Sequence, residues 1–174
     1  AGEGPTAAHR EGGRLAAAAL AALAEARTPG DAPLAVAATM VALTYDTLPS
    51  LTELEAELAA LPDDRYGRAL RGWLSDLRAA LRPDGTLAPI QARVTVARIG
   101  QYALVFLPGE IFWEIGQEIA LALPASQVWV TGYCHDFIGY VPTAAAWPEG
   151  GYEVDGAHRF LGLWRVGRDA GDRL

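Results

Sequence analysis

The sequence contains no lysine, one cysteine and one methionine. All 14 cationic residues are arginine, and they are spread along a chain with a formal net charge of -7. A single cysteine excludes a disulfide-stabilised scaffold, and the lack of lysine excludes a P-loop for phosphate. An acidic chain with dispersed arginines is a poor candidate for binding nucleic acid or an anionic membrane, because both need a clustered basic surface. No apolar run reaches the roughly 18 residues of a membrane-spanning helix, so we expect no transmembrane segment.

The chain has 174 residues, of which 51% are hydrophobic and 20% are charged. This composition is typical of a globular protein and excludes a disordered one. The length fits one folded domain over residues 1–174. The chain begins Ala-Gly-Glu-Gly, with neither an initiator methionine nor a signal peptide. We therefore expect it to be a piece of something longer.

The first half is mainly helical in pattern. Residues 14–27 consist almost entirely of strong helix formers. Residues 34–45 are apolar and predict a buried strand. Ser50 and Glu53 have the spacing of a capping box at the start of a second helix. A third helix opens at Pro62-Asp63, and one apolar stripe runs along it: Leu70, Trp73, Leu74, Leu77 and Leu81.

The second half alternates strand and helix patterns. Residues 91–98 and 101–107 predict a hairpin, residues 111–122 a helix, and residues 127–133 a third strand. Residues 161–174 predict a final helix. The order strand, helix, strand over residues 101–133 matches one βαβ unit. The predicted fold class is therefore α/β, a mixed sheet with a βαβ unit in the second half and helices packed on it.

The βαβ unit predicts where chemistry can occur. Its two strands are parallel, so their carboxyl ends lie at the same sheet edge, where ligands of open α/β sheets bind. Glu110 follows the first strand, after Gly109, which allows a sharp turn. The segment from Tyr133 to Tyr140, which contains His135, follows the second strand. This places a carboxylate, an imidazole, a second carboxylate (Asp136) and a phenol within reach of one another, and such a set can bind a metal or move protons.

Each of these residues also has a simpler interpretation. Glu110 can sit in the first turn of the following helix, where the dipole favours an anion. His135 can be an ordinary loop histidine, and Asp136 can cap a turn. Cys134 fits a small buried hydrophobe. Because Cys134 and His135 are adjacent, an extended backbone points them to opposite faces, which disfavours a Cys–His nucleophile pair.

Three motifs resemble the neutral/alkaline, non-lysosomal ceramidases and their bacterial relatives. They are Leu107-Pro108-Gly109-Glu110, the segment from Gly132 to Thr143, and Gly150-Gly151-Tyr152-Glu153, and they occur in this order in that family. The second motif is the most specific. The family commonly has Asn where this chain has His135, and Tyr where it has Phe137. The resemblance covers the later part of the family's catalytic domain.

The resemblance implies a zinc-dependent amidohydrolase that cleaves the N-acyl amide bond of ceramide-like lipids with a metal-activated water. In the family one zinc ion is bound by two His, one Glu and one Tyr. The Glu corresponds to Glu110 and the Tyr to Tyr140. Tyr152 corresponds to an aromatic residue near the family's site, and we take Tyr152 and His135 as candidate catalytic residues.

The family's two histidine ligands lie in a part of its domain that this sequence lacks. Neither His9 nor His158 falls on a matching motif. We therefore expect the chain to be the C-terminal half of a larger ceramidase-like catalytic domain, a processed product, or one subunit of a split enzyme. Zinc is then expected only with the two missing His ligands, supplied by the N-terminal half or a partner subunit. The alternative is a non-catalytic interaction or structural module that retains the fold. Family members are often secreted, but this sequence does not reveal a compartment.

Overall fold

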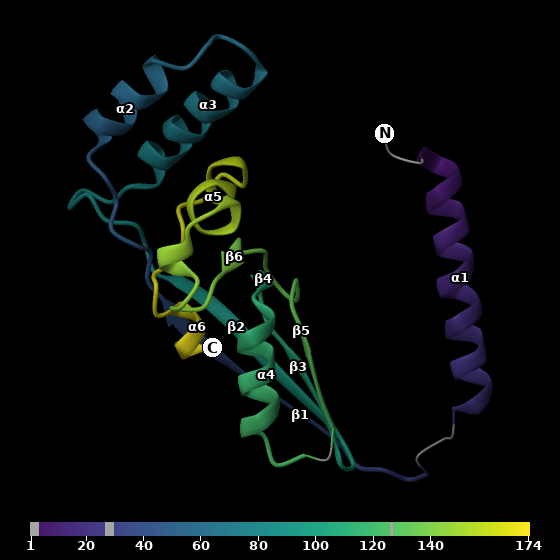
Figure 1. Ribbon diagram of the computed structural model, residues 1–174. Coiled ribbons are helices and arrows are strands. Elements are labelled where there is room, and N and C mark those ends of the chain that lie inside the picture. The colour runs from purple at the N-terminus through teal and green to yellow at the C-terminus, as the bar shows by residue number, and fades with distance from the viewer. Residues whose placement is uncertain (1–3, 27–29, 126) are drawn as a thin grey trace. The chain divides into compact units, whose positions relative to one another are not determined.

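The computed structural model describes residues 4–26, 30–125 and 127–174. The chain forms two compact units, residues 1–32 and residues 33–174. The described part of the first unit contains one helix, α1 (Gly4–Glu25), which includes most of the helix formers of residues 14–27 and also extends over the glycine-containing segment before them. The second unit contains all other elements (Figure 1). No described helix is both long and apolar enough to cross a bilayer.

A four-stranded sheet forms the centre of the second unit (Figure 1). Its strands lie in the order β1 (Leu34–Leu43), β2 (Ile90–Ile99), β3 (Tyr102–Phe106) and β5 (Gln127–Thr131). β1, β2 and β3 pair antiparallel, whereas β3 and β5 pair parallel, with α4 (Trp113–Ala122) between them in sequence. The mixed sheet, the hairpin and the βαβ unit are therefore confirmed.

The two faces of this sheet differ in burial. Val94, Val105 and Leu107 form a core cluster on one face, with Ile119 of α4 packed against it. On the other face, Leu34, Val36 and Met40 of β1 are 67%, 63% and 54% exposed. The predicted burial of this strand is therefore wrong for most of its length. The core clusters of the second unit cover only the opposite face of β1, where Val41 and Leu43 lie.

Two helices, α2 (Leu51–Ala59) and α3 (Arg65–Ala80), form a hairpin with its own core. The predicted capping box is present, because the Ser50 hydroxyl accepts from the Glu53 amide and the Glu53 carboxylate accepts from the Ser50 amide. The apolar stripe predicted for α3 is buried from Leu70 to Leu77. The hairpin core consists of Leu54, Leu58, Leu70, Trp73, Leu74, Leu77 and Trp164.

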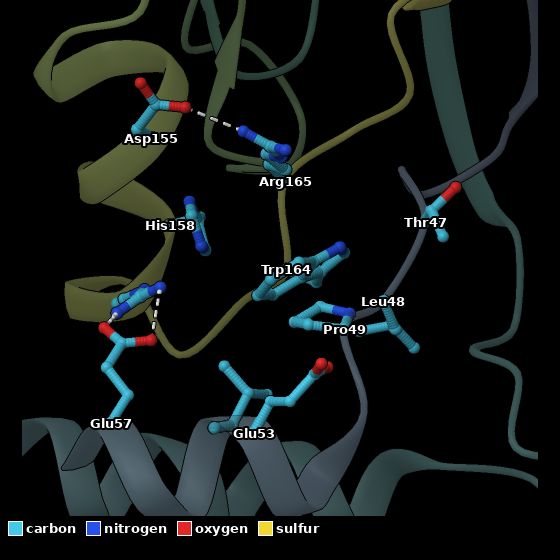
Figure 2. Close-up of a pocket in the computed structure, with 11 residues that line it drawn as sticks. Thr47, Leu48, Pro49, Glu53, Glu57, Asp155, His158, Trp164 and Arg165 are labelled. Carbon is cyan, nitrogen blue, oxygen red and sulfur yellow. Dashed lines mark hydrogen bonds and ion pairs between the residues drawn. The ribbon is translucent and has the colours of Figure 1, made fainter.

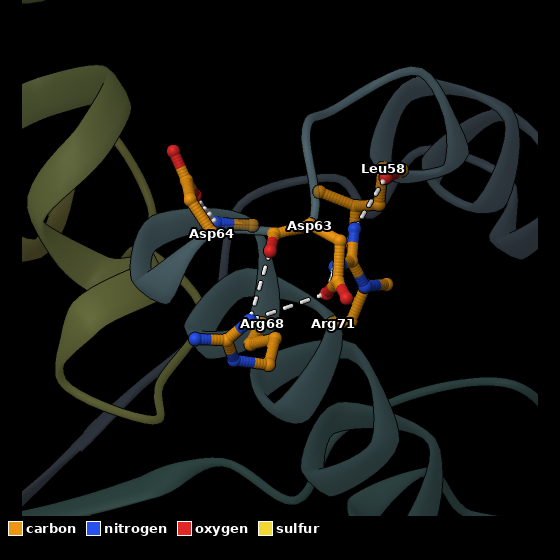
Figure 3. Close-up of polar contacts among 6 residues, drawn as sticks. Leu58, Asp63, Asp64, Arg68 and Arg71 are labelled. Atoms are coloured by element: carbon orange, nitrogen blue, oxygen red, sulfur yellow. Dashed lines mark hydrogen bonds and ion pairs between the residues drawn. The ribbon is translucent and has the colours of Figure 1, made fainter.

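Polar contacts fix the connection between α2 and α3 (Figure 3). The Asp64 carboxylate accepts from the Gly67 amide at 2.8 Å and so caps the start of α3. Arg71 donates to the Asp63 carboxylate at 2.8 Å and to the Leu58 carbonyl at 3.4 Å. A Cβ on Gly67 would lie 2.1 Å from the Pro62 carbonyl oxygen, so only glycine allows this close approach.

Ser50→Ala is expected to destabilise the second unit by about 1 kcal/mol, because it removes the side-chain acceptor of the α2 cap. Urea unfolding followed by circular dichroism measures this change. Ser75→Ala is the matched control, since Ser75 is exposed within α3. Alanine has the higher helix propensity there, so the control should leave the stability equal or slightly higher. Equal midpoints for wild type and Ser50→Ala would contradict a stabilising capping box.

The C-terminal region differs from the predicted helix over residues 161–174. Only α6 (Ala170–Arg173) is helical there. Val166 instead forms a β-bridge with Tyr45, and the Gly167 amide donates to the Thr44 carbonyl at 2.7 Å. Gly162 has a positive φ of 70°. The backbone groups of this segment are thus satisfied by residues far away in sequence, which a local pattern does not reveal. Three short helices precede this C-terminal region: the 3-10 helix η1 (Trp147–Glu149), the π-helix η2 (Tyr152–Gly156) and α5 (Ala157–Phe160).

Candidate metal and catalytic site

A second, two-stranded sheet brings Glu110 and Tyr140 together. It consists of β4 (Glu110–Ile111) and β6 (Tyr140–Val141), which pair parallel with Glu110 directly opposite Tyr140. The Glu110 amide donates to the Gly139 carbonyl at 2.8 Å. Since α4 begins at Trp113, Glu110 does not lie in the first turn of that helix. The simpler interpretation of Glu110 as a helix-dipole partner is therefore wrong.

Gly109 determines how closely the two strands approach. Its φ is 76°, a left-handed conformation that favours glycine. A Cβ at this position would lie 2.5 Å from the Gly139 carbonyl oxygen and 2.8 Å from Cγ1 of Ile138. The Gly109 carbonyl also accepts from the Tyr133 amide at 2.7 Å. Gly109 therefore holds the start of β4 close to two parts of the segment that follows β5: Tyr133, by a hydrogen bond, and Gly139, by close approach.

The Glu110 carboxylate is the polar centre of this region. The Tyr133 hydroxyl donates a hydrogen bond to Glu110 Oε2. A hydrogen bond with Glu110, together with some loss of hydration and the negative charge of Glu110, raises the pKa of Tyr140 to about 12. The rings of Tyr140 and Tyr152 meet edge to face, with centroids 6.2 Å apart. One carboxylate and three phenols therefore gather at this point.

The other two polar residues predicted for this edge do not join the group. His135 and Asp136 are both exposed, and the His135 side chain forms no hydrogen bond or ion pair with another described residue. The Asp136 backbone carbonyl, rather than its carboxylate, accepts from the Gly109 amide at 3.0 Å. Cys134 is partly buried, and its thiol donates to the Gly132 carbonyl at 3.3 Å. The catalytic role of His135 stays a prediction.

Tyr133, which contacts the Glu110 carboxylate, is not among the residues predicted from the sequence for this site. The sequence pattern places Tyr133 at the correct sheet edge but assigns it no role. The available signal is the position of Tyr133 just beyond β5, seven residues before Tyr140. Within the described ranges, no cluster of three or more His, Cys, Asp and Glu side chains could hold a metal ion. Glu110 and the tyrosines together offer oxygen ligands alone.

A separate pocket of about 450 Å³ lies beside His158 (Figure 2). Neither Glu110, Tyr140 nor Tyr152 lines it. His158 is 6% exposed, and its ring meets Trp164 edge to face at 4.8 Å between centroids. Both imidazole nitrogens lack a hydrogen-bond partner among the described residues. The surrounding ion pairs join Arg159 to Glu57, and Arg165 to Asp155 and Asp46.

His158 is expected to make the stability of the second unit depend on pH. Burial first, and then the charges of Arg159 and Arg165, lower its pKa from 6.5 to about 4, against the opposing charges of Asp155 and Asp46. The unfolded chain binds a proton near pH 6.5, whereas the folded chain resists it until about pH 4. The contribution of neutral His158 to stability is therefore expected to be full above pH 6.5 and to fall as the pH drops toward 4, by up to about 3 kcal/mol.

Urea unfolding at pH 7 and pH 5 tests this effect. His158→Gln should make the loss of stability between the two pH values smaller, because glutamine does not titrate. His9→Gln is the matched control, since His9 is exposed in α1, and it should leave the loss unchanged. If His158→Gln and wild type lose the same stability on acidification, the buried imidazole is not the cause.

Comparison with known proteins found a similar solved structure. No family model matches the sequence, and no curated protein matches it. The chain is similar to neutral ceramidase from Pseudomonas aeruginosa, with 16% sequence identity and a TM-score of 0.41. The similarity covers 82% of this chain and 29% of that chain. The chain thus corresponds to less than a third of the length of that ceramidase.

Proposed function

We propose that this chain supplies part of the active site of a zinc-dependent, ceramidase-like amidohydrolase. The observation that carries the proposal is the direct pairing of Glu110 and Tyr140 across β4 and β6. The motif resemblance identifies the same two residues as metal ligands. They come from segments 30 residues apart (110 and 140), so their pairing is not a result of sequence proximity. The proposed reaction is cleavage of the N-acyl amide bond of a ceramide-like lipid.

The two residues fit half of a zinc shell. Carboxylate oxygen is an ordinary zinc ligand. The Tyr140 phenol is neutral near pH 7 in any case, and a hydrogen bond with Glu110, together with some loss of hydration and the charge of Glu110, raises its pKa to about 12 and so disfavours the phenolate further. A divalent cation reverses this effect, since it favours the phenolate over the phenol. A zinc ion bound there would supply a Lewis acid and a water of lowered pKa.

The other residues of the chain have supporting roles in this proposal. We assign to Tyr152, whose ring contacts that of Tyr140, the donation of a hydrogen bond to the negative charge that develops on the amide oxygen. His135 is the candidate for proton transfer, and its exposed imidazole is free to approach a substrate from solvent.

The remaining ligands, two histidines, are proposed to come from the N-terminal half of the same domain or from a partner subunit. The exposed apolar side chains of the sheet support a docking partner. Leu34, Val36 and Met40 on β1, with Trp129 on β5, are all at least half exposed. β1 also presents an edge of ten uncharged residues, Leu34–Leu43, and such an edge can pair with another strand.

Zinc analysis tests the half-site. The purified chain should take up zinc weakly and show no amide hydrolysis. The same chain co-expressed with the proposed N-terminal half should retain one zinc ion per complex after dialysis and should cleave a fluorogenic N-acyl substrate. Tight, stoichiometric zinc in the isolated chain would contradict the half-site, and a complex without zinc would contradict the proposed chemistry.

A non-catalytic interaction module is the second candidate. The exposed apolar face of the sheet favours it independently of Glu110 and Tyr140. The two candidates differ in their response to the double variant Glu110→Gln/Tyr140→Phe. A binding module should hold its partner with unchanged affinity and have no zinc-dependent activity to lose, whereas the enzyme should lose zinc and turnover.

A further inference from the structure

Tyr133 has an unusual backbone conformation. Among the described non-glycine residues, Tyr133 and His135 alone have positive φ values, 57° and 68°. Such a conformation is unfavourable for a residue with a side chain, and it persists only where the surrounding structure enforces it. The Tyr133 amide donates to the Gly109 carbonyl at 2.7 Å, and the Cys134 amide donates to the Leu107 carbonyl at 2.9 Å. These two bonds hold the strained turn against the segment that precedes Glu110.

The Tyr133 side chain is fixed at two points. Its ring stacks on that of Phe137, with centroids 5.6 Å apart and planes 5° from parallel. Its hydroxyl donates to Glu110 Oε2. The ring is otherwise open to solvent, with 63% of the residue exposed. An exposed tyrosine loses rotamer freedom when its hydroxyl is held in this way, so the strained backbone and the stacked ring together direct the phenol at one carboxylate.

We propose that Tyr133 is a positioning residue that fixes the carboxylate of Glu110 beside Tyr140, an inference that rests on the proposed function. A carboxylate has two oxygens and about four acceptor sites. A hydrogen bond from Tyr133 to Oε2 therefore leaves acceptor sites for a cation while it restricts rotation of the Glu110 side chain. Partners of this kind orient metal-binding carboxylates, and their loss typically costs 10–100-fold in metal affinity.

Tyr133→Phe isolates the hydroxyl, because it retains the ring and the stacking on Phe137. Tyr66→Phe is the matched control. Tyr66 is also an exposed tyrosine, and its ring contacts that of Phe160 at 5.4 Å between centroids. Its hydroxyl has no hydrogen-bond partner in the described part of the chain. Any effect of removing an exposed phenol oxygen in general therefore appears in both variants.

NMR couplings that report the χ1 angle of Glu110 test positioning without a metal. The wild-type chain and Tyr66→Phe should show a single Glu110 rotamer, and Tyr133→Phe should show averaged couplings. The midpoint of urea unfolding should stay the same in all three proteins. An unchanged Glu110 rotamer in Tyr133→Phe overturns the inference, whether or not the chain binds zinc.

Zinc titration of the co-expressed complex then tests the consequence. Tyr133→Phe should weaken zinc binding about 10-fold or more, with Tyr66→Phe equal to wild type. If no protein binds zinc while Glu110 loosens in Tyr133→Phe, the proposed function fails and the positioning role stands. If zinc binds equally to all three, the inferred role of Tyr133 toward the metal is wrong and the proposed function stands.

Discussion

Glu110→Gln is expected to remove zinc from the complex and to lower kcat/KM for amide hydrolysis by more than about 100-fold. The reason is chemical, since glutamine keeps the size of the side chain and loses the negative charge that binds the cation. Loss of a partner that only orients a ligand costs 10–100-fold, so loss of the ligand itself should cost more. Zinc per complex by elemental analysis and initial rates on an N-acyl substrate measure the two effects.

The fold should tolerate this substitution. Glu110 pairs with β6 through its backbone amide, which glutamine retains. The Tyr133 hydroxyl can still donate to the side-chain amide oxygen of the substituted glutamine. Glu114→Gln serves as the control, because Glu114 is an exposed carboxylate in the first turn of α4. Wild-type zinc content and rate in Glu110→Gln would contradict its role as a ligand, and an equal loss in Glu114→Gln would indicate a general charge effect.

The parts of the fold that the sequence predicts correctly are those with local causes. The capping box at Ser50 and Glu53 needs only the spacing of two residues. The apolar stripe of α3 needs only the helical period. The parallel strands β3 and β5 follow from two apolar strands with a helix between them, which leaves few other topologies. The parallel pairing of β3 with β5 in turn brings the segments that follow these strands, which carry Glu110 and Tyr140, to the same end of the sheet.

The parts that the sequence does not predict have causes far away in the chain. β4 and β6 are two residues each, too short for any periodic pattern, and they exist because Gly109 lets residues 110 and 140 meet. The left-handed conformation at Tyr133 could not be predicted, because the residue that adopts it is not a glycine. The segment before α6 is not helical, because Val166 instead forms a β-bridge with Tyr45, two residues beyond the end of β1. Its apolar residues are equally compatible with either structure.

Burial of β1 fails as a prediction for a different reason. An apolar run indicates side chains that avoid water when a surface is available to cover them, whereas the exposure of β1 shows that the second unit itself covers only one face of this strand. The mismatch at Leu34, Val36 and Met40 is therefore itself informative. These side chains give the second unit an exposed apolar surface, and contiguous apolar surfaces of this kind are common at binding sites.

Gly109→Ala is expected to destabilise the second unit by about 3 kcal/mol or more. An alanine at a φ of 76° is strained by itself. Its Cβ also meets the Gly139 carbonyl oxygen at 2.5 Å, and a backbone atom cannot move aside as a flexible side chain can. Gly109 directly precedes β4 and Gly139 directly precedes β6, so both the backbone strain and the steric contact should weaken the pairing of these two strands. Urea unfolding measures the loss, and hydrogen exchange at the Glu110 amide reports whether its bond to Gly139 is the one that weakens.

Gly72→Ala makes this experiment specific, because Gly72 lies within α3 and a Cβ added there would have no atom within 4 Å outside its own helix turn. Alanine should stabilise the helix there by about 1 kcal/mol, so the two glycine substitutions should have opposite signs. If Gly109→Ala leaves both stability and Glu110 exchange at wild-type values, the close approach of the strands is not needed to pair Glu110 with Tyr140. If the Glu110 amide exchanges faster while the hairpin of α2 and α3 stays protected, then one glycine controls whether the two proposed ligands meet.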